Sequence, residues 1–158
     1  MEWEEPTLES IIQGKATNFS NAVILPRNVE WLYLLLNNAQ KPSNSSNGSP
    51  AIHPKRLHGH DFYILSEGNS PFNRMLITLN PPRRDSFIVT SGHLLLAWKV
   101  GNPGVWLFHC HLGWRTEMVF DLQFIEHPES IPSITNLTAL EENCQEWKIS
   151  AHKWNIVK

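Results

Sequence analysis

The 158-residue chain has few of the features that mark membrane proteins or nucleic-acid-binding proteins. It contains 13 Lys and Arg against 15 Asp and Glu, and its formal net charge is −2. Because no basic stripe is present, the charge pattern indicates neither nucleic acid nor a membrane surface as a partner. No apolar run is long enough to span a bilayer. Residues 1–10 (MEWEEPTLES) lack the apolar core of a secretory signal, so taken alone they predict a chain that stays in the cytosol.

The aromatic and proline content favours a β protein. Seven Trp, seven Phe and eleven Pro are more typical of a loop-rich β fold than of a helical one. A length of 158 residues predicts one domain, residues 1–158. We expect an all-β Greek-key sandwich with a short C-terminal helix. The expected strands are at 22–26, 31–36, 61–66, 86–90, 93–100 and 118–125, and the expected helix is at 138–154.

Polar segments separate the expected strands. Residues 41–50 (KPSNSSNGSP) predict a surface loop, and residues 101–104 (GNPG) predict a tight turn. Residues 80–85 (NPPRRD) also predict a turn, because two prolines do not fit inside a paired strand. Its two arginines fit either a solvated loop, which is slightly favoured, or a contact with another domain.

The triplet His109-Cys110-His111 is the first feature that indicates chemistry. Residues 105–108 (VWLF) form a strand-like run that leads into it, and successive side chains of a strand point to opposite faces. We therefore expect Cys110 to face away from both histidines, so that one strand could serve two metal sites. Thiolate and imidazole both suit copper. The ordinary alternative is that the triplet packs in a core, where cysteine is common.

A second histidine cluster lies upstream, at residues 53–60 (HPKRLHGH). The two clusters together resemble the paired copper motifs of the multicopper oxidases, HPxHLHGH followed by HCHxxWH. The resemblance to fungal laccases extends through HGHDFYIL, LNPPRRD, the FHCH run after NPG and a late Cys-x-x-Trp. The chain is therefore identified as similar to the C-terminal cupredoxin domain of an ascomycete laccase-like enzyme, over nearly its whole length.

This resemblance implies two copper sites. In the mononuclear site, His53 and Cys110 match two of the strong ligands, and Phe120 stands at the axial position. In a trinuclear site shared with the family's first domain, the matching ligands are His58, His109 and His111. His60 matches a family histidine that is not a ligand, which predicts a structural hydrogen bond.

Two of the expected ligands are replaced by arginine. Arg115 stands where the second histidine of the mononuclear site is expected, and Arg56 where a fourth trinuclear ligand is expected. A guanidinium has no lone pair to give and stays protonated, so neither residue can replace an imidazole on copper. We therefore expect an incomplete copper set in this chain.

The family function would be oxidation of phenols with reduction of dioxygen to water, in some ascomycetes within secondary metabolism. The HWHG and HSH motifs of the first domain do not occur in these 158 residues. Two interpretations follow from the resemblance. The chain is either an oxidoreductase component that works with a second chain supplying the missing domains, or a catalytically silent cupredoxin-like remnant or binding module. By itself it is expected to be inactive.

Several residues carry weaker indications. A disulfide between Cys110 and Cys144 would remove the copper thiolate and is rejected; in the resembled enzymes, a cysteine placed like Cys144 bonds to the first domain. Trp114 is expected to pack beneath the copper strand. Histidines without a motif, namely His93, His127 and His152, are expected to be ordinary core or surface residues. N-x-S/T sequons indicate a secretory route, as in the usually secreted family members, and leave the localisation open; they lie at Asn18, Asn44, Asn47 and Asn136.

Overall fold

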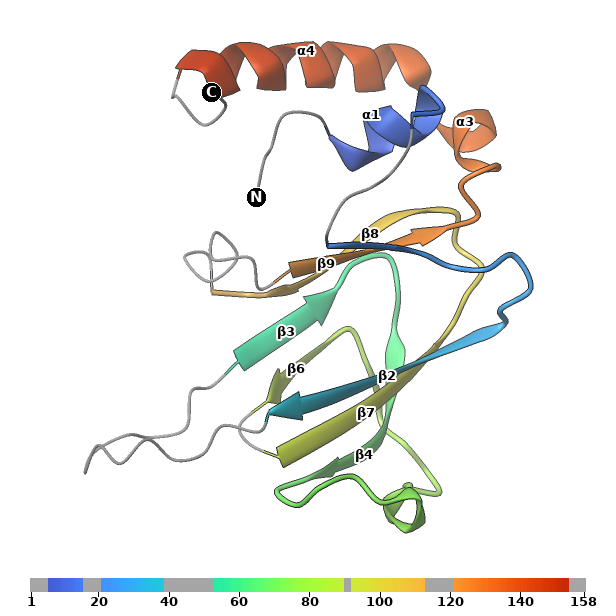
Figure 1. Ribbon diagram of the computed structural model, residues 1–158, viewed down its shortest axis with the longest axis vertical. Coiled ribbons are helices and arrows are strands. Elements are labelled where there is room, and N and C mark those ends of the chain that lie inside the picture. The colour runs from blue at the N-terminus through green and yellow to red at the C-terminus, as the bar shows by residue number, and fades with distance from the viewer. Residues whose placement is uncertain (1–5, 16–20, 39–52, 90–91, 113–120, 154–158) are drawn as a thin grey trace.

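The computed structural model describes residues 6–15, 21–38, 53–89, 92–112 and 121–153. Its strands form two sheets packed as a sandwich, with helices at one end (Figure 1). The first sheet has the order β1 (Ala22–Ile24), β9 (Asp121–Glu126), β8 (Gly104–Cys110), β3 (His53–Leu57), β6 (Ser86–Val89). The second has the order β2 (Trp31–Asn38), β7 (Gly92–Lys99), β4 (Phe62–Gly68), β5 (Arg83–Arg84).

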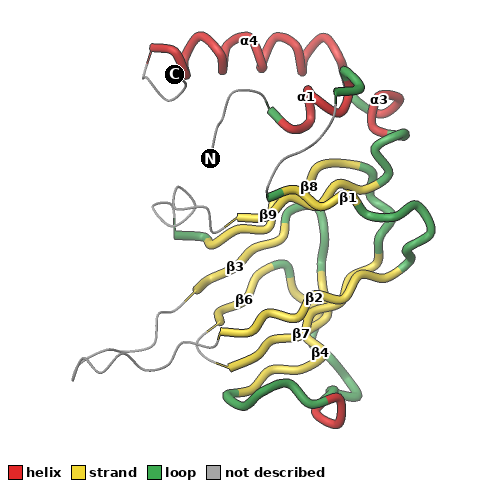
Figure 2. The backbone as a smooth tube through the Cα atoms, in the orientation of Figure 1, coloured by secondary structure: helices red, strands yellow, loops and turns green. Residues whose placement is uncertain are grey.

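The chain crosses between the two sheets several times. Strands β3 and β4 are consecutive in sequence but lie in different sheets, and so do β6 and β7. Within the first sheet, β3 pairs antiparallel with both β6 and β8. This placement brings the strand that begins with His53 beside the strand that ends with Cys110, as the tube in Figure 2 shows.

Strand β2 shows why these sequences form a sandwich. Its leucines at 32, 34 and 36 pack against the core, whereas the alternate residues Trp31, Tyr33 and Leu35 remain 39 to 62% exposed. Period-two alternation of this kind places one face of a strand against the core. Strand β7, its partner in the middle of the second sheet, is buried along most of its length, in agreement with its sequence HLLLAWK.

The core between the sheets is rich in aromatic rings. Trp98 and Phe62 are fully buried, and both pack edge-on against rings from the opposite sheet. The Trp98 and Phe124 ring centroids are 5.0 Å apart, and those of Phe62 and Phe87 are 5.3 Å apart. Such edge-to-face pairs contribute about 0.5–1.5 kcal/mol beyond the burial of their surface. They fix the two sheets relative to each other.

Helices lie over the first sheet (Figure 1). The predicted C-terminal helix is α4 (Leu137–Lys153), and Asn136 caps it by accepting a hydrogen bond from the Ala139 N–H at 3.1 Å. Helix α1 (Thr7–Ile12) was not predicted; it is joined to α4 by an ion pair between Glu9 and Lys148 at 2.7 Å. Two short helical segments complete the described chain, η1 (Arg74–Leu76) and α3 (Ile131–Ile134).

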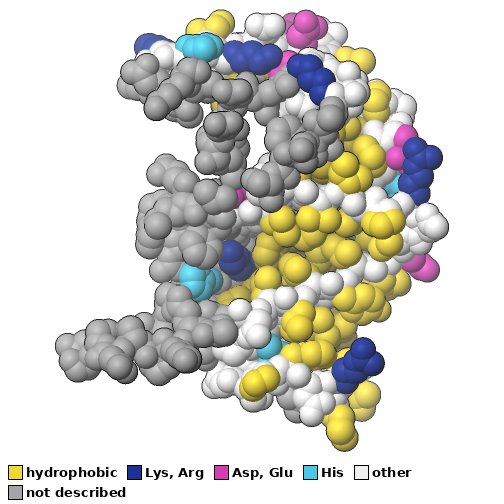
Figure 3. Space-filling view, in the orientation of Figure 1, with side chains coloured by type: hydrophobic (Ala, Val, Ile, Leu, Met, Phe, Trp, Pro, Cys, Tyr) yellow, Lys and Arg dark blue, Asp and Glu magenta, His cyan; other side chains and the backbone are white. Residues whose placement is uncertain are grey.

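The expected turn at residues 80–85 contains a short strand. Arg83 and Arg84 form β5 and pair with the start of β4, while the two prolines precede it and need no N–H donor there. Hydrophobic side chains gather over the strands on the face shown in Figure 3. No helix among the described residues is long and apolar enough to cross a membrane.

Candidate metal centre

The register of β3, β8 and β9 places the site residues on two faces of the first sheet. His109 lies opposite Arg56 on β3 and opposite Asp121 on β9, and directly opposed residues share a face. Cys110 lies opposite Lys55, on the face that also carries Leu57, and is completely buried. The predicted division of His109 and Cys110 between two faces is therefore present in the structure.

His58 follows β3 and meets His109 on β8. Their Nε2 atoms are 3.0 Å apart and their rings stack with centroids 5.1 Å apart. The His58 N–H donates to the Leu107 carbonyl at 2.9 Å, which joins the two chain segments beside the pair. At this distance the two nitrogens share one hydrogen. One imidazole donates its N–H, and the other accepts the hydrogen bond with its lone pair.

His111 lies next to this pair. Its ring centroid is 5.6 Å from that of His109, and its backbone N–H donates to the Pro54 carbonyl at 2.7 Å. The side chain is exposed, so it can change rotamer at little cost. The structure thus joins His58 to His109 and places His111 beside them, so the three imidazoles predicted for one site are neighbours.

The environment of His109 favours its neutral form. Partial burial lowers its pKa, and the like charges of His58, His111 and Lys55 lower it further against the opposing effect of a hydrogen bond to the Cys110 carbonyl. A neutral imidazole is the form that binds a metal ion. His109 can therefore offer a lone pair at neutral pH.

The fit of copper to these residues is partial. Imidazole nitrogens suit copper, and His58 and His109 already converge. No set of three or more His, Cys, Asp or Glu side chains within the described ranges is grouped closely enough to hold a metal ion. A bound ion would therefore have to replace the hydrogen bond between His58 and His109 and recruit His111.

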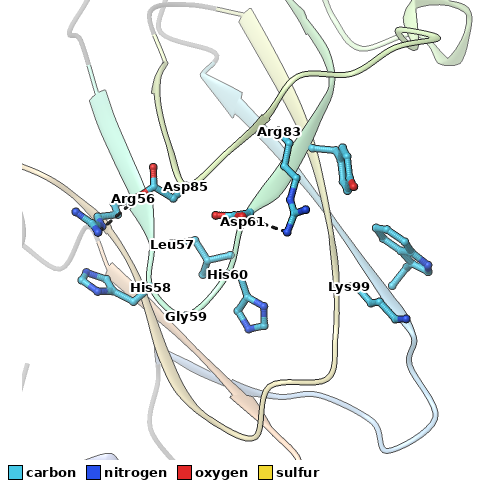
Figure 4. A pocket seen from close by; sticks show the side chains of 11 residues that line it. Arg56, Leu57, His58, Gly59, His60, Asp61, Arg83, Asp85 and Lys99 are labelled. Atoms are coloured by element: carbon cyan, nitrogen blue, oxygen red, sulfur yellow. Dashed lines mark ion pairs between the residues drawn. The ribbon is translucent and has the colours of Figure 1, made fainter.

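Arg56 occupies the predicted position of a missing imidazole. Its guanidinium forms an ion pair with Asp85 at 3.5 Å, and both side chains remain partly exposed (Figure 4). Its Nε atom is buried and makes no hydrogen bond. The pair neutralises the positive charge beside His109, but it adds no ligand to the site.

The mononuclear site extends beyond the described residues. His53 begins β3 on the same face as Cys110, two positions before Lys55. Arg115, Phe120 and Trp114 lie outside the described ranges. The mononuclear ligand set therefore stays a prediction from the sequence.

An open hollow of about 640 Å³ adjoins His58. In Figure 4, Arg56 and His58 lie close together at the left, and the His60 ring points in a different direction. Arg83 lies on the wall of the hollow, paired with Asp61 at 3.1 Å and positioned 5.9 Å from the Tyr63 ring centroid. Arg83 thus makes contacts within this chain, on the partly exposed rim of the hollow.

Sequence reasoning missed Glu126 and Asp121. Glu126 is fully buried, and its Oε1 lies 2.9 Å from His60 Nε2, a contact that is not a hydrogen bond. It also accepts from the Trp98 indole at 3.4 Å and from the Gly101 and Asn102 N–H groups at 3.1 and 3.2 Å. His60 therefore contacts the buried carboxylate, but its Nε2 does not form the structural hydrogen bond that the sequence predicts.

The pKa values of these two carboxyl groups move in opposite directions. Burial alone would raise the pKa of Glu126, but its contact with His60 and the backbone N–H donors outweigh burial and lower the pKa. Burial raises the pKa of Asp121, and its hydrogen bond from Asn21 offsets this only partly. Neither residue carries a motif, and only the strand register brings Asp121 opposite His109.

His93 and His127 make contacts outside the imidazole pair, and the two cysteines are not bonded to each other. His93 is buried and bonded to the Ser66 hydroxyl and the Ser70 carbonyl, at 2.9 and 2.6 Å, which is a core role. His127 lies 3.7 Å from Glu129. Cys110 and Cys144 are both buried and form no disulfide with each other, as predicted.

Comparison with known proteins identifies the family. The multicopper oxidase family profile matches residues 1–130. The chain belongs to the multicopper oxidase family. Dihydrogeodin oxidase of Aspergillus terreus is 36% identical over 94% of this chain and 27% of its own length. Laccase-1 of Botryotinia fuckeliana is 33% identical over 94% of this chain and 27% of its own length.

The fold comparison agrees with the family. The crystal structure of laccase from Botrytis aclada is 32% identical and superposes with a TM-score of 0.76, covering 94% of this chain and 28% of the laccase. The described sandwich is therefore a cupredoxin-like fold, and it corresponds to the C-terminal region of laccase. The chain spans about a quarter of the length of these multicopper oxidase relatives.

Proposed function

We propose that this multicopper oxidase chain is the copper-binding C-terminal part of a laccase-type oxidoreductase acting on phenols and dioxygen. The observation that carries the proposal is the convergence of His58 and His109, with their Nε2 atoms 3.0 Å apart, beside His111 and on the face opposite Cys110. Membership of the multicopper oxidase family supports copper as the metal. A role in secondary metabolism is part of the same proposal.

The residues of this chain would hold one copper ion between His58, His109 and His111. When bound, copper supplies one-electron oxidation of a phenol and electron delivery to dioxygen. His109 stays neutral and keeps a lone pair available, because burial and neighbouring positive charges lower its pKa. His111 is exposed and can turn toward the pair. The hollow beside His58 leaves this face open to small molecules.

Turnover would need a second chain or further domains. The first-domain motifs HWHG and HSH are absent from the 158 residues, and Arg56 and Arg115 supply no imidazole. A surface for such a partner is supported by the exposed side chains of Trp31, Tyr33 and Leu35 on β2, because exposed apolar patches often mark protein contacts. By itself the chain binds copper without consuming dioxygen.

Two observations favour a second function. The ion pair between Arg56 and Asp85 fills the position of a ligand, and no group of three donors is preformed among the described residues. Both facts fit a catalytically silent cupredoxin-like module that binds metal weakly or not at all.

Thermal unfolding with added Cu²⁺ tests the proposal. A ligand at 100 times its Kd stabilises the folded state by about 2.7 kcal/mol, which raises the melting temperature by several degrees. The double variant His109→Ala/His111→Ala should lose this increase. The control His152→Ala changes an exposed histidine on α4 and should keep it. A chain that Cu²⁺ does not stabilise would leave only the silent module, and a double variant that keeps the full increase would place the copper elsewhere and contradict the proposed site.

A further inference from the structure

We propose that Asn102 is a positioning residue that fixes the backbone beside His58 and thereby sets the distance between His58 and His109. The inference rests on the proposed copper site. Asn102 lies in the turn between β7 and β8, 43 residues away from Gly59 in the sequence. Its role depends on three sets of contacts that meet at the peptide following His58.

The first contact is the bond from Asn102 to the His58 loop, defined as residues 58–60. The side-chain amide of Asn102 donates through Nδ2 to the Gly59 carbonyl at 2.9 Å. A short, directional bond of this kind orients the peptide plane that it contacts. On the other side of the same short segment, the His58 N–H donates to the Leu107 carbonyl at 2.9 Å. His58 is therefore held at both of its flanks.

The second set of contacts makes Asn102 itself rigid. Its backbone N–H donates to Oε2 of the fully buried Glu126 at 3.2 Å, beside the same donation from Gly101 at 3.1 Å. Its carbonyl accepts a hydrogen bond from Trp106 Nε1 at 2.7 Å. Glu126 also contacts His60 at 2.9 Å, so one carboxylate holds both the turn and the far end of the His58 loop. These bonds fix the backbone of Asn102, and with it the position from which its side-chain amide reaches Gly59.

The third contact leaves Gly59 no room to shift. Gly59 has φ +75°, and a Cβ atom added there would lie 2.3 to 2.7 Å from three carbon atoms of the Trp106 indole. Trp106 belongs to β8, three residues before His109. Strand β8 therefore carries both His109 and the Trp106 ring, and the His58 loop packs against that ring.

These contacts together give the consequence for the metal site. Loop residues usually sample several backbone positions, and such motion would make the distance between the His58 and His109 imidazoles vary. Here the loop is tied to β8 by Trp106 and Leu107, and to the preceding turn by Asn102. A preorganised pair of donors binds a metal more tightly than one that must be assembled, and loss of such supporting bonds typically weakens metal affinity about 10- to 100-fold. We expect loss of the Asn102 bond to weaken metal affinity about tenfold, at the lower end of this range, because Asn102 contacts the backbone and not an imidazole.

The test compares Asn102→Ala with Asn73→Ala. Asn73→Ala also removes a single hydrogen bond between a side chain and the backbone, because Asn73 Oδ1 accepts from the Met75 N–H at 3.1 Å. Asn73 lies beside η1, away from the metal site. In the metal-free protein, side-chain ¹⁵N resonances report the contact between His58 and His109. We expect Asn102→Ala to shift these resonances toward those of solvent-bonded imidazoles, and Asn73→Ala to leave them unchanged. Calorimetric titration with Cu²⁺ should show about tenfold weaker binding only in Asn102→Ala.

A second variant separates positioning from loss of volume. Asn102→Asp keeps the shape but presents an oxygen to the Gly59 carbonyl, so it should shift the imidazole resonances at least as far as alanine does. Imidazole resonances that match the wild type in both Asn102 variants would overturn the inference. If the wild-type chain binds no Cu²⁺, the proposed function fails, whereas the metal-free resonances still decide the role of Asn102.

Discussion

Arg56 and His109 face each other across β3 and β8, and the chemistry of the site depends on that pair of positions. A guanidinium at this position neutralises Asp85 but cannot bind copper. Arg56 and Asp85 are both partly exposed, so their ion pair contributes little to stability, about 0–1 kcal/mol. The residue therefore affects the metal site far more than the fold.

Restoring an imidazole at residue 56 should strengthen the site. Arg56→His places a fourth imidazole directly opposite His109, beside the three of the proposed site, so we expect Cu²⁺ affinity to rise at least about tenfold. Arg56→Gln removes the same charge and adds no imidazole, and should change the affinity by less than about threefold. Calorimetric titration of the three proteins measures the difference. Equal gains in both variants would show that charge, not ligand number, limits binding.

At the scale of elements, the sequence predicts the sandwich well where the pattern is local. Strand β2 was expected at 31–36 and runs to Asn38, and α4 was expected at 138–154 and covers Leu137–Lys153. The period-two alternation of β2 follows from local chain geometry. Short α1 and the two-residue β5 were not predicted, because α1 rests on tertiary contacts such as Glu9 with Lys148, and β5 on pairing with β4.

The candidate site divides in the same way. The resemblance to multicopper oxidases predicts His58, His109 and His111 as ligands, and strand alternation predicts the opposite face for Cys110. The structure joins His58 to His109, places the His111 ring 5.6 Å from that of His109, and puts Cys110 on the other face. The network around Glu126 could not be predicted, because its members come from β9, the turn before β8 and the His58 loop. Only the folded chain brings these segments into contact.

Glu126 joins three elements and should make the fold sensitive to acid. Its folded pKa lies below its ordinary value of 4.5, so its stabilising contribution is present above that pH and is lost as the pH falls through the folded pKa. Glu126→Gln should lower the free energy of unfolding by about 1–3 kcal/mol at pH 7 and reduce its decline in acid. Urea unfolding at pH 7 and pH 4 measures both effects.

The control for this prediction is Glu30→Gln. Glu30 is exposed and lies 4.0 Å from Lys99, so its replacement should change the free energy of unfolding by less than about 0.5 kcal/mol at either pH. If Glu126→Gln behaved like Glu30→Gln, the carboxylate would not be the centre of the network.

For the whole molecule, the main fact is that the chain spans 27% of the length of laccase-1, a relative to which it is 33% identical. In the proposed laccase-type function, reduction of dioxygen to water would need copper ligands from another domain, and the HWHG and HSH motifs expected for them do not occur in these 158 residues. The copper-loaded chain should therefore consume no dioxygen with a diphenol. Uptake should appear only after mixing with a chain that carries HWHG and HSH motifs. An oxygen electrode measures both, and copper-dependent uptake by the single chain would contradict the proposal.

The most direct test of the account is the electron paramagnetic resonance spectrum of the chain loaded with one equivalent of Cu²⁺. The account places copper on His58, His109 and His111, because His53 and Cys110 supply only two strong ligands of the mononuclear site. It predicts a wide copper hyperfine splitting with nitrogen couplings, both lost in His109→Ala/His111→Ala. A narrow splitting typical of thiolate-bound copper, unchanged in that double variant, would place the metal at Cys110 and contradict the account.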